Sequence, residues 1–304
     1  MKIVFMGTSE FAVPALKMLY ENHEVLLVVT QPDKFVGRKK ELLFSPVKIY
    51  ANYVGLKIVQ PEKLSIIEAD IIALKPDYII TAAYGQMLSK NLLDNVKSIN
   101  IHGSLLPKFR GASPIQHALF AGLKETGITI MFMDYKMDTG PIIKQRKVEI
   151  YHDDNYKKLM LRMSFVGADL LKEVLSENIT SIPQIDSEAT YAKILTRADE
   201  FIDFNLTTKE IINKIKGLSP NIGGYNIINN NQIKFYDAKQ SDIINNKVLP
   251  GTILCLDKNF IIKTKDSSIE ILELQVSGKK KMFAKDFLNG QNIVKENDIF
   301  KKEV

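Results

Sequence analysis

The sequence predicts an α/β protein whose mainly parallel sheet is covered by helices on both faces, followed by a small β-barrel. Over residues 1–140, short apolar runs alternate with amphipathic helical patterns, which is typical of parallel sheets. Residues 155–175 carry one long amphipathic pattern. Beyond residue 206, short strand-like runs separated by turn residues replace this alternation, which favours a barrel.

The strands expected in the first part are short apolar runs, often β-branched, that are bounded by glycine, proline or polar residues. In chain order they are Lys2–Met6, Val25–Thr30, Lys57–Val59, Tyr78–Ala82, Ser98–His102 and Ile128–Met133. The helices expected between them cover Phe11–Leu19, Pro46–Val54, Ile66–Leu74 and Ile115–Ala121. Ser113 and Pro114 open the last of these helices as its N-cap and first residue. Because parallel strands require crossovers, this order predicts a sheet buried on both faces.

The region after the long helix predicts a change of architecture. Periodicity weakens from Ser176 to about Leu206, so we expect a first domain at residues 1–187, a linker at 188–205 and a second domain at 206–304. One helix is expected at Lys209–Lys216. The strands expected after it are Gln232–Ala238, Gly251–Leu256, Phe260–Thr264, Glu270–Val276 and Lys281–Ala284. Short strands with turn signals between them indicate a small β-barrel.

The composition excludes several classes of protein. With 45% hydrophobic and 25% charged residues, the chain has the composition of a globular protein. Its single cysteine, Cys255, excludes an intrachain disulfide framework and a cysteine-ligated zinc site, and its four histidines leave little room for another metal centre. No apolar run is long enough to span a membrane, and the first residues do not form a signal peptide. We therefore expect a cytoplasmic protein with no metal and no membrane contact.

The excess of basic residues is concentrated in two places. The formal net charge is +6, and residues 206–304 account for +5 of it, with 16 basic and 11 acidic side chains. In the nearly neutral first part, the stretch Asp33–Lys48 holds five basic residues against two acidic ones. A single basic run is most often a solvated face, but two basic zones in one chain favour a polyanionic partner.

The turn after the first strand, Gly7-Thr8-Ser9, lies where a dinucleotide-binding fingerprint would begin. Ser9 occupies the place of the second glycine, where the backbone must approach a pyrophosphate closely. No acidic residue ends the second strand to hold a ribose. The sequence therefore argues against a nicotinamide enzyme and favours a tight strand-to-helix turn.

The strand Ser98–His102 carries a polar pair at its carboxyl end. Side chains alternate along a strand, so Asn100 and His102 face one way and Ile101 faces the other. Open α/β sheets bind their ligands at this end of their strands. A histidine passes protons near neutral pH, and an asparagine amide can donate a hydrogen bond to a developing oxyanion. The pair is therefore a candidate catalytic site.

An acidic partner for this histidine is expected after the strand Ile128–Met133, at its carboxyl end. Asp134 and Asp138 both follow that strand, and either carboxylate can orient the histidine and stabilise its protonated form. Taken alone, a surface turn explains either residue. No serine lies in a nucleophile-elbow sequence. An Asn-His-Asp trio without a metal favours transfer of an activated acyl group to an amine.

These motifs resemble those of the folate-dependent formyltransferases. The signature reads Asn100-Ile-His102-Gly-Ser-Leu-Leu-Pro107, Arg110-Gly111-Ala-Ser-Pro114-Ile-Gln116 and Asp138-Thr-Gly140. Supporting stretches are Phe5-Met-Gly7-Thr-Ser-Glu-Phe11-Ala, Gln31-Pro-Asp33, Gly37-Arg38-Lys39-Lys40, Ser45-Pro-Val-Lys48 and Ala82-Ala-Tyr84-Gly85. Within that family the chain is most similar to the methionyl-tRNA formyltransferases. The resemblance covers nearly all of the first 205 residues and is looser beyond them.

The resemblance implies a doubly wound, Rossmann-like formyltransferase domain followed by an OB-like β-barrel domain that binds tRNA. It implies that a monomer transfers the formyl group of 10-formyltetrahydrofolate to the α-amino group of methionyl-initiator tRNA, for translation initiation. It also assigns roles to residues. Asn100, His102 and Asp138 match the catalytic trio, with Asp138 rather than Asp134 as the acid. Ser104, Leu105, Leu106 and Pro107 match a tetrahydrofolate-binding segment, Tyr84 and Gly85 would line the pteridine pocket, and Arg38, Lys39 and Lys40 match a basic loop that grips the acceptor stem.

The sequence leaves two other interpretations of the function open. One is a formyltransferase that acts on a small amine, either glycinamide ribonucleotide or a nucleotide amino-sugar. The glycinamide enzyme would normally end near the end of the first domain, and the sugar-modifying type requires neither a basic barrel nor the loop Arg38–Lys40. The other is an RNA-binding protein with an inactive core, which the intact Asn100, His102 and Asp138 argue against.

Overall fold

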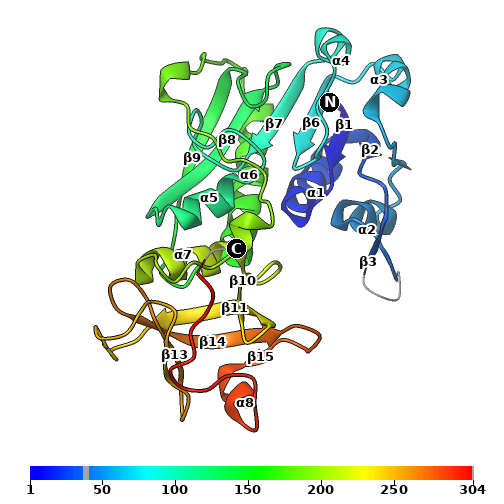
Figure 1. The fold of residues 1–304 in the computed structure, drawn as a ribbon. Coiled ribbons are helices and arrows are strands. Elements are labelled where there is room, and N and C mark those ends of the chain that lie inside the picture. Colours follow the sequence, from blue (N-terminus) through cyan, green and yellow to red (C-terminus); the bar gives the residue numbers. More distant parts are fainter. Residues whose placement is uncertain (37–40, 303–304) are drawn as a thin grey trace. The chain divides into compact units, whose positions relative to one another are not determined.

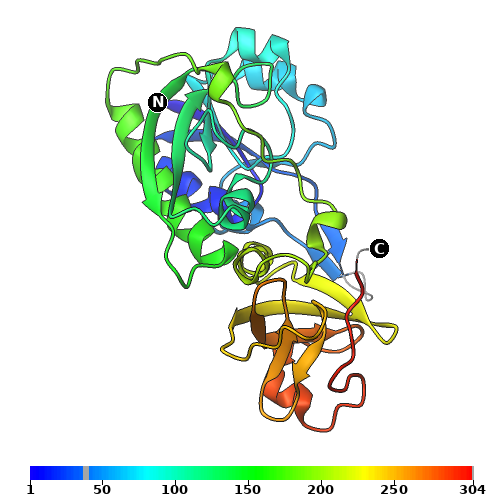
Figure 2. The same cartoon turned by 60° about the vertical axis from the view of Figure 1, so that its left-hand side comes forward.

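The computed structural model describes residues 1–36 and 41–302, which form two compact units (Figures 1 and 2). The first unit comprises Met1–Pro114, Glu125–Ile150 and Leu159–Lys193. The second comprises Ile115–Lys124, Tyr151–Lys158 and the chain from Ile194 onward. Each unit is built around a sheet of its own.

The first unit contains a seven-stranded sheet with the order β5-β2-β1-β6-β7-β8-β9. Its strands are β1 (Lys2–Gly7), β2 (Glu24–Val29), β5 (Ile58–Val59), β6 (Tyr78–Ala82), β7 (Ser98–His102), β8 (Glu125–Phe132) and β9 (Ile142–Glu149). From β5 to β7 all neighbours are parallel, whereas β8 runs antiparallel to β7, and β9 to β8. The mainly parallel α/β sheet that the sequence predicts is confirmed.

Helices cover both faces of this sheet, as the alternation of strands and helices predicts. In the first unit they are α1 (Val13–Asn22), α2 (Pro46–Tyr53), α3 (Glu68–Ala73), α4 (Lys90–Asn95) and α6 (Tyr156–Ser176), whereas α5 (Pro114–Phe120) belongs to the second unit from Ile115 onward. On one face, Val4 and Ile79 belong to a buried cluster with Ile71 of α3 and Leu92 of α4. On the other face, α6 packs so closely on β7 that a Cβ atom at Gly167 would lie 3.0 Å from the side chain of Ile101.

The edge strands β8 and β9 depart from the sequence prediction. The sequence does not predict β9, because three of its side chains are Lys or Arg. It also predicts that β8 is parallel to its neighbours, so that its carboxyl end would lie beside the carboxyl end of β7. In the structure the carboxyl end of β8 lies beside the first residue of β7 instead, where the N–H of Met133 donates to the carbonyl of Ser98. The segment 133–141 must therefore fold back over the sheet to bring Asp138 to His102, at the far end of β7.

A two-stranded hairpin, β3 (Lys34–Val36) with β4 (Glu41–Leu43), projects between β2 and α2. Its base is fixed by polar contacts. Lys48 and Gln60 both donate to the carboxylate of Asp33, and Ser45 caps α2 and shares a hydrogen bond of 2.8 Å with Thr30. The basic residues Arg38, Lys39 and Lys40, which the sequence places in this loop, lie outside the described residues.

The second unit contains an antiparallel sheet with the order β10-β11-β14-β13-β12, in which β15 also pairs with β14. Its elements are α7 (Thr208–Leu218), β10 (Gly224–Ile228), β11 (Asn231–Gln240), β12 (Ile253–Cys255), β13 (Phe260–Lys263), β14 (Ser268–Val276), β15 (Met282–Phe283) and α8 (Ala284–Leu288). The small antiparallel β domain is thus confirmed. Local sequence explains two of its features: Thr207 and Glu210 form a capping box that opens α7, and Asn229 and Asn230 adopt the positive φ of a two-residue hairpin turn.

The core of this unit is aromatic. Phe204, Phe235, Phe260 and Phe300 are at most 2% exposed and contact one another through ring pairs with centroids 5.1–6.4 Å apart. Large rings of this kind bury much apolar area and supply most of the packing of a small domain. Among the described residues of both units, no helix combines the length and apolarity needed to cross a membrane.

Candidate active site

The end of β7 places two polar side chains on one face of the first sheet. Asn100 and His102 lie on the side of Thr81 in the neighbouring strand β6, whereas Ile101 faces α6. This is the alternation that the sequence predicts. His102 is only 5% exposed, and a buried polar ring requires hydrogen-bond partners.

Both ring nitrogens of His102 face oxygen atoms. Nε2 lies 2.9 Å from the carbonyl oxygen of Phe109, which can only accept, so Nε2 carries a proton in this arrangement. Nδ1 lies 3.7 Å from Oδ1 of Asp138. That distance exceeds a direct hydrogen bond and matches a pair that a water molecule bridges or that closes by a small movement.

Asp138 is held in place at its side chain. Its Oδ2 atom accepts a hydrogen bond of 2.8 Å from the N–H of Gly111, which turns Oδ1 toward His102. The residue has a φ of +54°, in the left-handed region that is rare outside glycine, although Asp tolerates it better than most. Asp134, the other candidate, instead accepts from the N–H of the adjacent Tyr135 at 2.7 Å. The structure thus brings Asp138 to the histidine.

Asn100 is oriented by a residue that sequence reasoning misses. The hydroxyl of Thr81 donates to Oδ1 of Asn100 over 2.8 Å. In this orientation Oδ1 faces the hydroxyl, which leaves the Nδ2 amino group as the donor for a ligand. The alternation in the strand Tyr78–Ala82 could have revealed Thr81, because it is the polar residue of an otherwise apolar run.

A second residue that sequence reasoning misses, Gln184, holds the main chain of the turn at Asp138. Gln184 donates from Nε2 to the carbonyl oxygens of Asp138 and Gly140, at 2.9 and 2.7 Å. The buried guanidinium of Arg110 donates through Nε and Nη2 to Oε1 of Gln184, and its Nη2 also contacts Asp186 at 2.8 Å. Nothing in the local sequence around Gln184 marks this role.

The segment 190–192, within the expected linker, continues this support. It forms main-chain hydrogen bonds with Arg110: Arg110 donates to the carbonyl of Thr190, and Ala192 donates to that of Arg110, both at 2.8 Å. The side chain of Thr190 accepts in addition from the N–H of Phe109. Residues 109–111 are therefore fixed from one side by this segment, and they contact His102 and Asp138 from the other.

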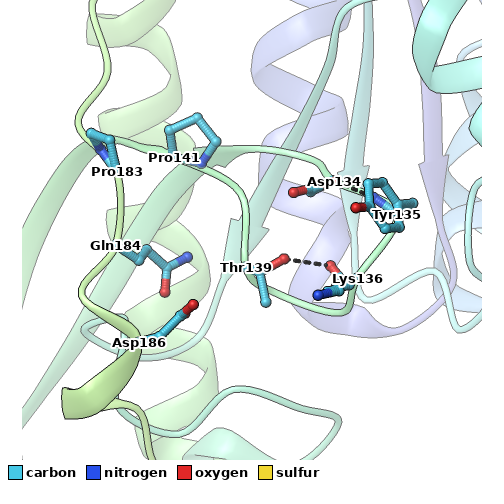
Figure 3. Close-up of a pocket in the computed structure, with 8 residues that line it drawn as sticks. All are labelled: Asp134, Tyr135, Lys136, Thr139, Pro141, Pro183, Gln184 and Asp186. Carbon is cyan, nitrogen blue, oxygen red and sulfur yellow. Dashed lines mark hydrogen bonds between the residues drawn. The ribbon is translucent and has the colours of Figure 1, made fainter.

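A polar pocket of about 320 Å³ lies on the outer side of this turn (Figure 3). In Figure 3, Thr139 and Lys136 of the turn face Gln184 and Asp186 of the segment after α6 across the opening. The full lining comprises Asp134, Tyr135, Lys136, Thr139, Pro141, Pro183, Gln184 and Asp186.

The predicted folate-binding segment, residues 104–107, lies beside β8 with its polar groups engaged. The hydroxyl of Thr129 donates to the carbonyl of Ser104 and accepts from the N–H of Leu106, at 2.6 and 3.1 Å. Gln145 donates to the carbonyl of Leu106. Ser104 and Leu106 are buried, whereas Leu105 and Pro107 are half-buried. Leu105 and Pro107 are therefore the more accessible residues of this segment.

Tyr84 and Gly85 follow the carboxyl end of β6 and lie close to the first turn of the chain. Thr8 donates its hydroxyl proton to the carbonyl of Tyr84 at 2.9 Å. The Tyr84 side chain is 4% exposed, and its buried hydroxyl has no hydrogen-bond partner among the described residues, nor does Nε2 of Gln31. Burial raises the pKa of the Tyr84 hydroxyl to about 12. Unpartnered buried polar atoms are costly and suit a place where a polar ligand binds.

Chemically, the site combines an acid-base group with a donor for negative charge. A histidine backed by a carboxylate can take up and release a proton, and the Nδ2 group of Asn100 lies on the same face of β7. The base of the β3–β4 hairpin is also electrostatically fixed, since the hydrogen bond from Lys48 lowers the pKa of Asp33, and Gln60 adds to this effect.

Two family models match the chain: the model described as formyl transferase matches residues 1–175, and the model described as formyl transferase, C-terminal domain, matches residues 194–292. The chain is 43% identical over 301 residues to the methionyl-tRNA formyltransferase of Staphylococcus aureus strain Newman. That alignment covers 95% of this chain and 96% of the relative.

Solved structures share the fold. HypX from Aquifex aeolicus in complex with tetrahydrofolic acid superposes with a TM-score of 0.66 at 16% identity, over 99% of this chain. The chain spans 50% of the length of HypX. The methionyl-tRNA formyltransferase from Clostridium thermocellum superposes with a TM-score of 0.60 at 20% identity, over 80% of this chain and 94% of that one.

Proposed function

Because the chain belongs to the formyl transferase family, we propose that it transfers the formyl group of 10-formyltetrahydrofolate to the α-amino group of methionyl-initiator tRNA. The observation that carries the chemistry is the histidine of β7, which is held between the carbonyl of Phe109 and the carboxylate of Asp138. The near full-length similarity to the methionyl-tRNA formyltransferase of Staphylococcus aureus supports the choice of acceptor. The product initiates translation.

The first step of the proposed mechanism forms the new carbon–nitrogen bond. The uncharged α-amino nitrogen attacks the formyl carbon, and the carbonyl electron pair moves onto the oxygen. The Nδ2 group of Asn100, oriented by Thr81, donates a hydrogen bond to that oxyanion. His102 adds positive charge nearby when both of its ring nitrogens are protonated, and Asp138 compensates this charge.

The second step moves one proton and breaks one bond. The attacking nitrogen loses a proton, and the leaving nitrogen N10 of the folate gains one. His102 and a water molecule bridging to Asp138 carry this proton, because the gap of 3.7 Å between Nδ1 and Oδ1 is too long for direct transfer. The oxyanion then returns its electron pair, the bond from carbon to N10 breaks, and tetrahydrofolate leaves. No metal is assigned a part in these steps.

The folate donor is proposed to lie between Tyr84 and Gly85 on one side and Leu105 and Pro107 on the other. The unpartnered hydroxyl of Tyr84 supports this position, because a polar atom of the pteridine could satisfy it. Ser104 and Leu106 would fix the segment from within through Thr129. Their role is to shape the pocket.

For tRNA, we assign the acceptor stem to the basic loop Arg38–Lys40 and the remaining contacts to residues 206–304. The charge of +5 on residues 206–304 supports this division, since phosphate contacts dominate the affinity of proteins for nucleic acids. The anchoring of the hairpin base by Asp33 and Lys48 suits a loop that must meet a rigid helical stem. On this proposal the enzyme acts as a monomer in the cytoplasm. Residues 1–187 form its catalytic domain, and residues 188–205 form the linker to the second domain.

Formyl transfer from 10-formyltetrahydrofolate to methionyl-initiator tRNA is the direct test. Methionyl-elongator tRNA, glycinamide ribonucleotide and a nucleotide amino-sugar serve as competing acceptors in parallel reactions. We expect formylation of the initiator tRNA to exceed that of every other acceptor. Preference for a small amine would refute the proposed substrate, and failure to release tetrahydrofolate with any acceptor would favour an inactive RNA-binding protein.

A further inference from the structure

The turn that carries Asp138 depends on contacts from elsewhere in the chain. Asp138 has a φ of +54°, a conformation that costs a non-glycine residue stability unless the surroundings hold it. The next residue but one, Gly140, is so tightly enclosed that a Cβ atom there would lie 1.9 Å from the carbonyl oxygen of Phe132. The position of the Asp138 carboxylate is therefore set by whatever fixes this main chain.

One side chain fixes it at two points. The amide nitrogen of Gln184 donates to the carbonyl oxygens of Asp138 and Gly140, which flank Thr139. These two carbonyls accept both protons of a single NH₂ group, so a shift of either residue breaks a hydrogen bond. Gln184 lies 46 residues from Asp138 in the sequence and touches neither the histidine nor the asparagine of the site in any contact described above.

The orientation of the Gln184 amide is itself decided by Arg110. Two N–H groups of the buried guanidinium, Nε and Nη2, donate to Oε1 of Gln184 at 3.0 and 2.9 Å. An arginine has no acceptor, so Oε1 must face it and Nε2 must face the turn. The amide cannot flip without setting donors against donors on one side and acceptors against acceptors on the other.

The same short segment then reaches the catalytic groups directly. Arg110 lies between Phe109, whose carbonyl accepts from His102, and Gly111, whose N–H holds the Asp138 carboxylate. Asp138 is thus tied to residues 110–111 at both its main chain, through Gln184, and its side chain. A shift of the turn relative to this segment would change the distance between His102 and Asp138.

From this closed set of hydrogen bonds we infer that Gln184 is a positioning residue for formyl transfer: it holds the turn so that Asp138 can serve His102. This inference rests on the proposed function. Gln184 contacts no reacting atom, so its loss should slow the chemical step and leave substrate binding largely intact. Misplacement of a catalytic group by an ångström is enough for a large effect on rate.

The test compares the variants Gln184→Met and Gln184→Glu with the wild type in formylation of methionyl-initiator tRNA. Methionine keeps the side-chain length but donates nothing. Glutamate keeps an acceptor for Arg110 but sets a carboxylate against two carbonyl oxygens. We expect both variants to lose kcat by about 10- to 100-fold, with KM for tRNA and for the folate donor within about threefold of wild type. Thermal melting shows that each variant is folded.

A double-mutant cycle separates positioning from a general structural role. In an Asp138→Asn background, Gln184→Met is expected to add less than about a twofold loss of kcat, because residues that act through one contact are not additive. An equally large loss in that background would overturn the inference, as would an unchanged kcat in both single variants.

The matched control is Asn22→Ala, at the end of α1 in the first unit. The Asn22 amide also donates to a main-chain carbonyl, that of Met18, and the residue has no part in the proposed site. We expect this variant to leave kcat unchanged, and a loss of kcat equal to that of Gln184→Met would contradict the inference. A wild-type chain that transfers no formyl group would instead refute the proposed function, which keeps the two failures distinct.

Discussion

The main-chain N–H of Gly111 holds Oδ2 of Asp138 at 2.8 Å, and Oδ1 of the same carboxylate faces Nδ1 of His102. Gly111 has a φ of +121°, and a Cβ atom there would lie 2.5 Å from the carbonyl oxygen of Ala192. Only glycine fits this position. The acid of the proposed catalytic trio is therefore placed by a residue of the Arg110-Gly111 motif that contributes no side chain.

Replacing His102 with alanine should lower kcat by about 10²–10⁴-fold, the usual contribution of one positioned acid-base group. The reason is that an imidazole ring can accept a proton from one substrate group and donate it to another, whereas alanine can do neither. Initial rates of methionyl-tRNA formylation under saturating donor measure this effect. Turnover close to wild type would remove His102 from the mechanism.

The two candidate acids should respond differently to the same change. Asp138→Asn keeps an acceptor for Gly111 but removes the charge opposite His102, so kcat should fall by about 10²-fold or more. Asp134→Asn changes only a local contact with Tyr135 and should leave kcat within about threefold of wild type. The second variant is the matched control for the first. The reverse order of effects would assign the acid's role to Asp134.

Removing the hydroxyl of Thr81 should weaken the orientation of Asn100. Thr81→Val keeps the shape of the side chain but leaves Oδ1 of Asn100 without its donor, so the amide can rotate. We expect kcat to fall by about 10-fold, less than the 10²–10³-fold loss expected for Asn100→Ala, which deletes the oxyanion donor itself. Steady-state kinetics of both variants decide this, and a larger effect at Thr81 than at Asn100 would contradict the proposed roles.

Tyr84 should make stability depend on pH in the alkaline range. Burial raises its pKa to about 12, above the ordinary value of 10.0. The unfolded chain therefore loses this proton first, so the contribution of Tyr84 to stability is complete below pH 10 and is lost as the pH rises toward 12. Chemical denaturation at several alkaline pH values should show this loss in the wild type and a smaller one in Tyr84→Phe.

The same variant tests the proposed folate contact. Tyr84→Phe removes a buried hydroxyl that has no partner among the described residues, so the free enzyme should be at least as stable as wild type at neutral pH. If the hydroxyl meets the donor, KM for 10-formyltetrahydrofolate should rise by about two- to tenfold, the value of one hydrogen bond. An unchanged KM would place the donor elsewhere.

The basic loop should contribute salt-dependent affinity for tRNA. Alanine at Arg38, Lys39 and Lys40 should weaken tRNA binding and reduce the slope of log affinity against log salt by about two to three, because each phosphate contact releases about one counterion. Filter binding over a range of salt concentrations measures both. The control removes three exposed lysines outside the loop, Lys75, Lys90 and Lys97, at the same cost in net charge. Equal effects of both triple variants would remove the loop from the tRNA contact surface.

Local sequence predicts much of the first sheet, because a buried strand or helix is encoded by the spacing of its own side chains. The period of two in Ser98–His102 is enough to put Asn100 and His102 on one face. Periodicity cannot predict β9, because its lysine and arginine side chains interrupt the apolar pattern. They belong to an edge strand and form ion pairs with Glu125 and Glu173. Nor can periodicity predict that β8 runs antiparallel to β7, which makes the segment between β8 and β9 the path by which the chain returns to the site.

The sequence by itself determined the alternation of strands and helices, the polar pair at the end of β7, and the motifs that mark the family. The family motif also selected Asp138 over Asp134. Only the tertiary structure showed the hydrogen bonds that place Asp138 beside His102, and only it revealed Gln184. The physical reason is the separation along the sequence between the residues that interact. Periodicity and capping act over a few neighbouring residues, whereas the hydrogen bonds that hold Asp138 join it to Gly111 and Gln184, 27 and 46 residues away. No local pattern records such a pairing, which exists only once the chain has folded.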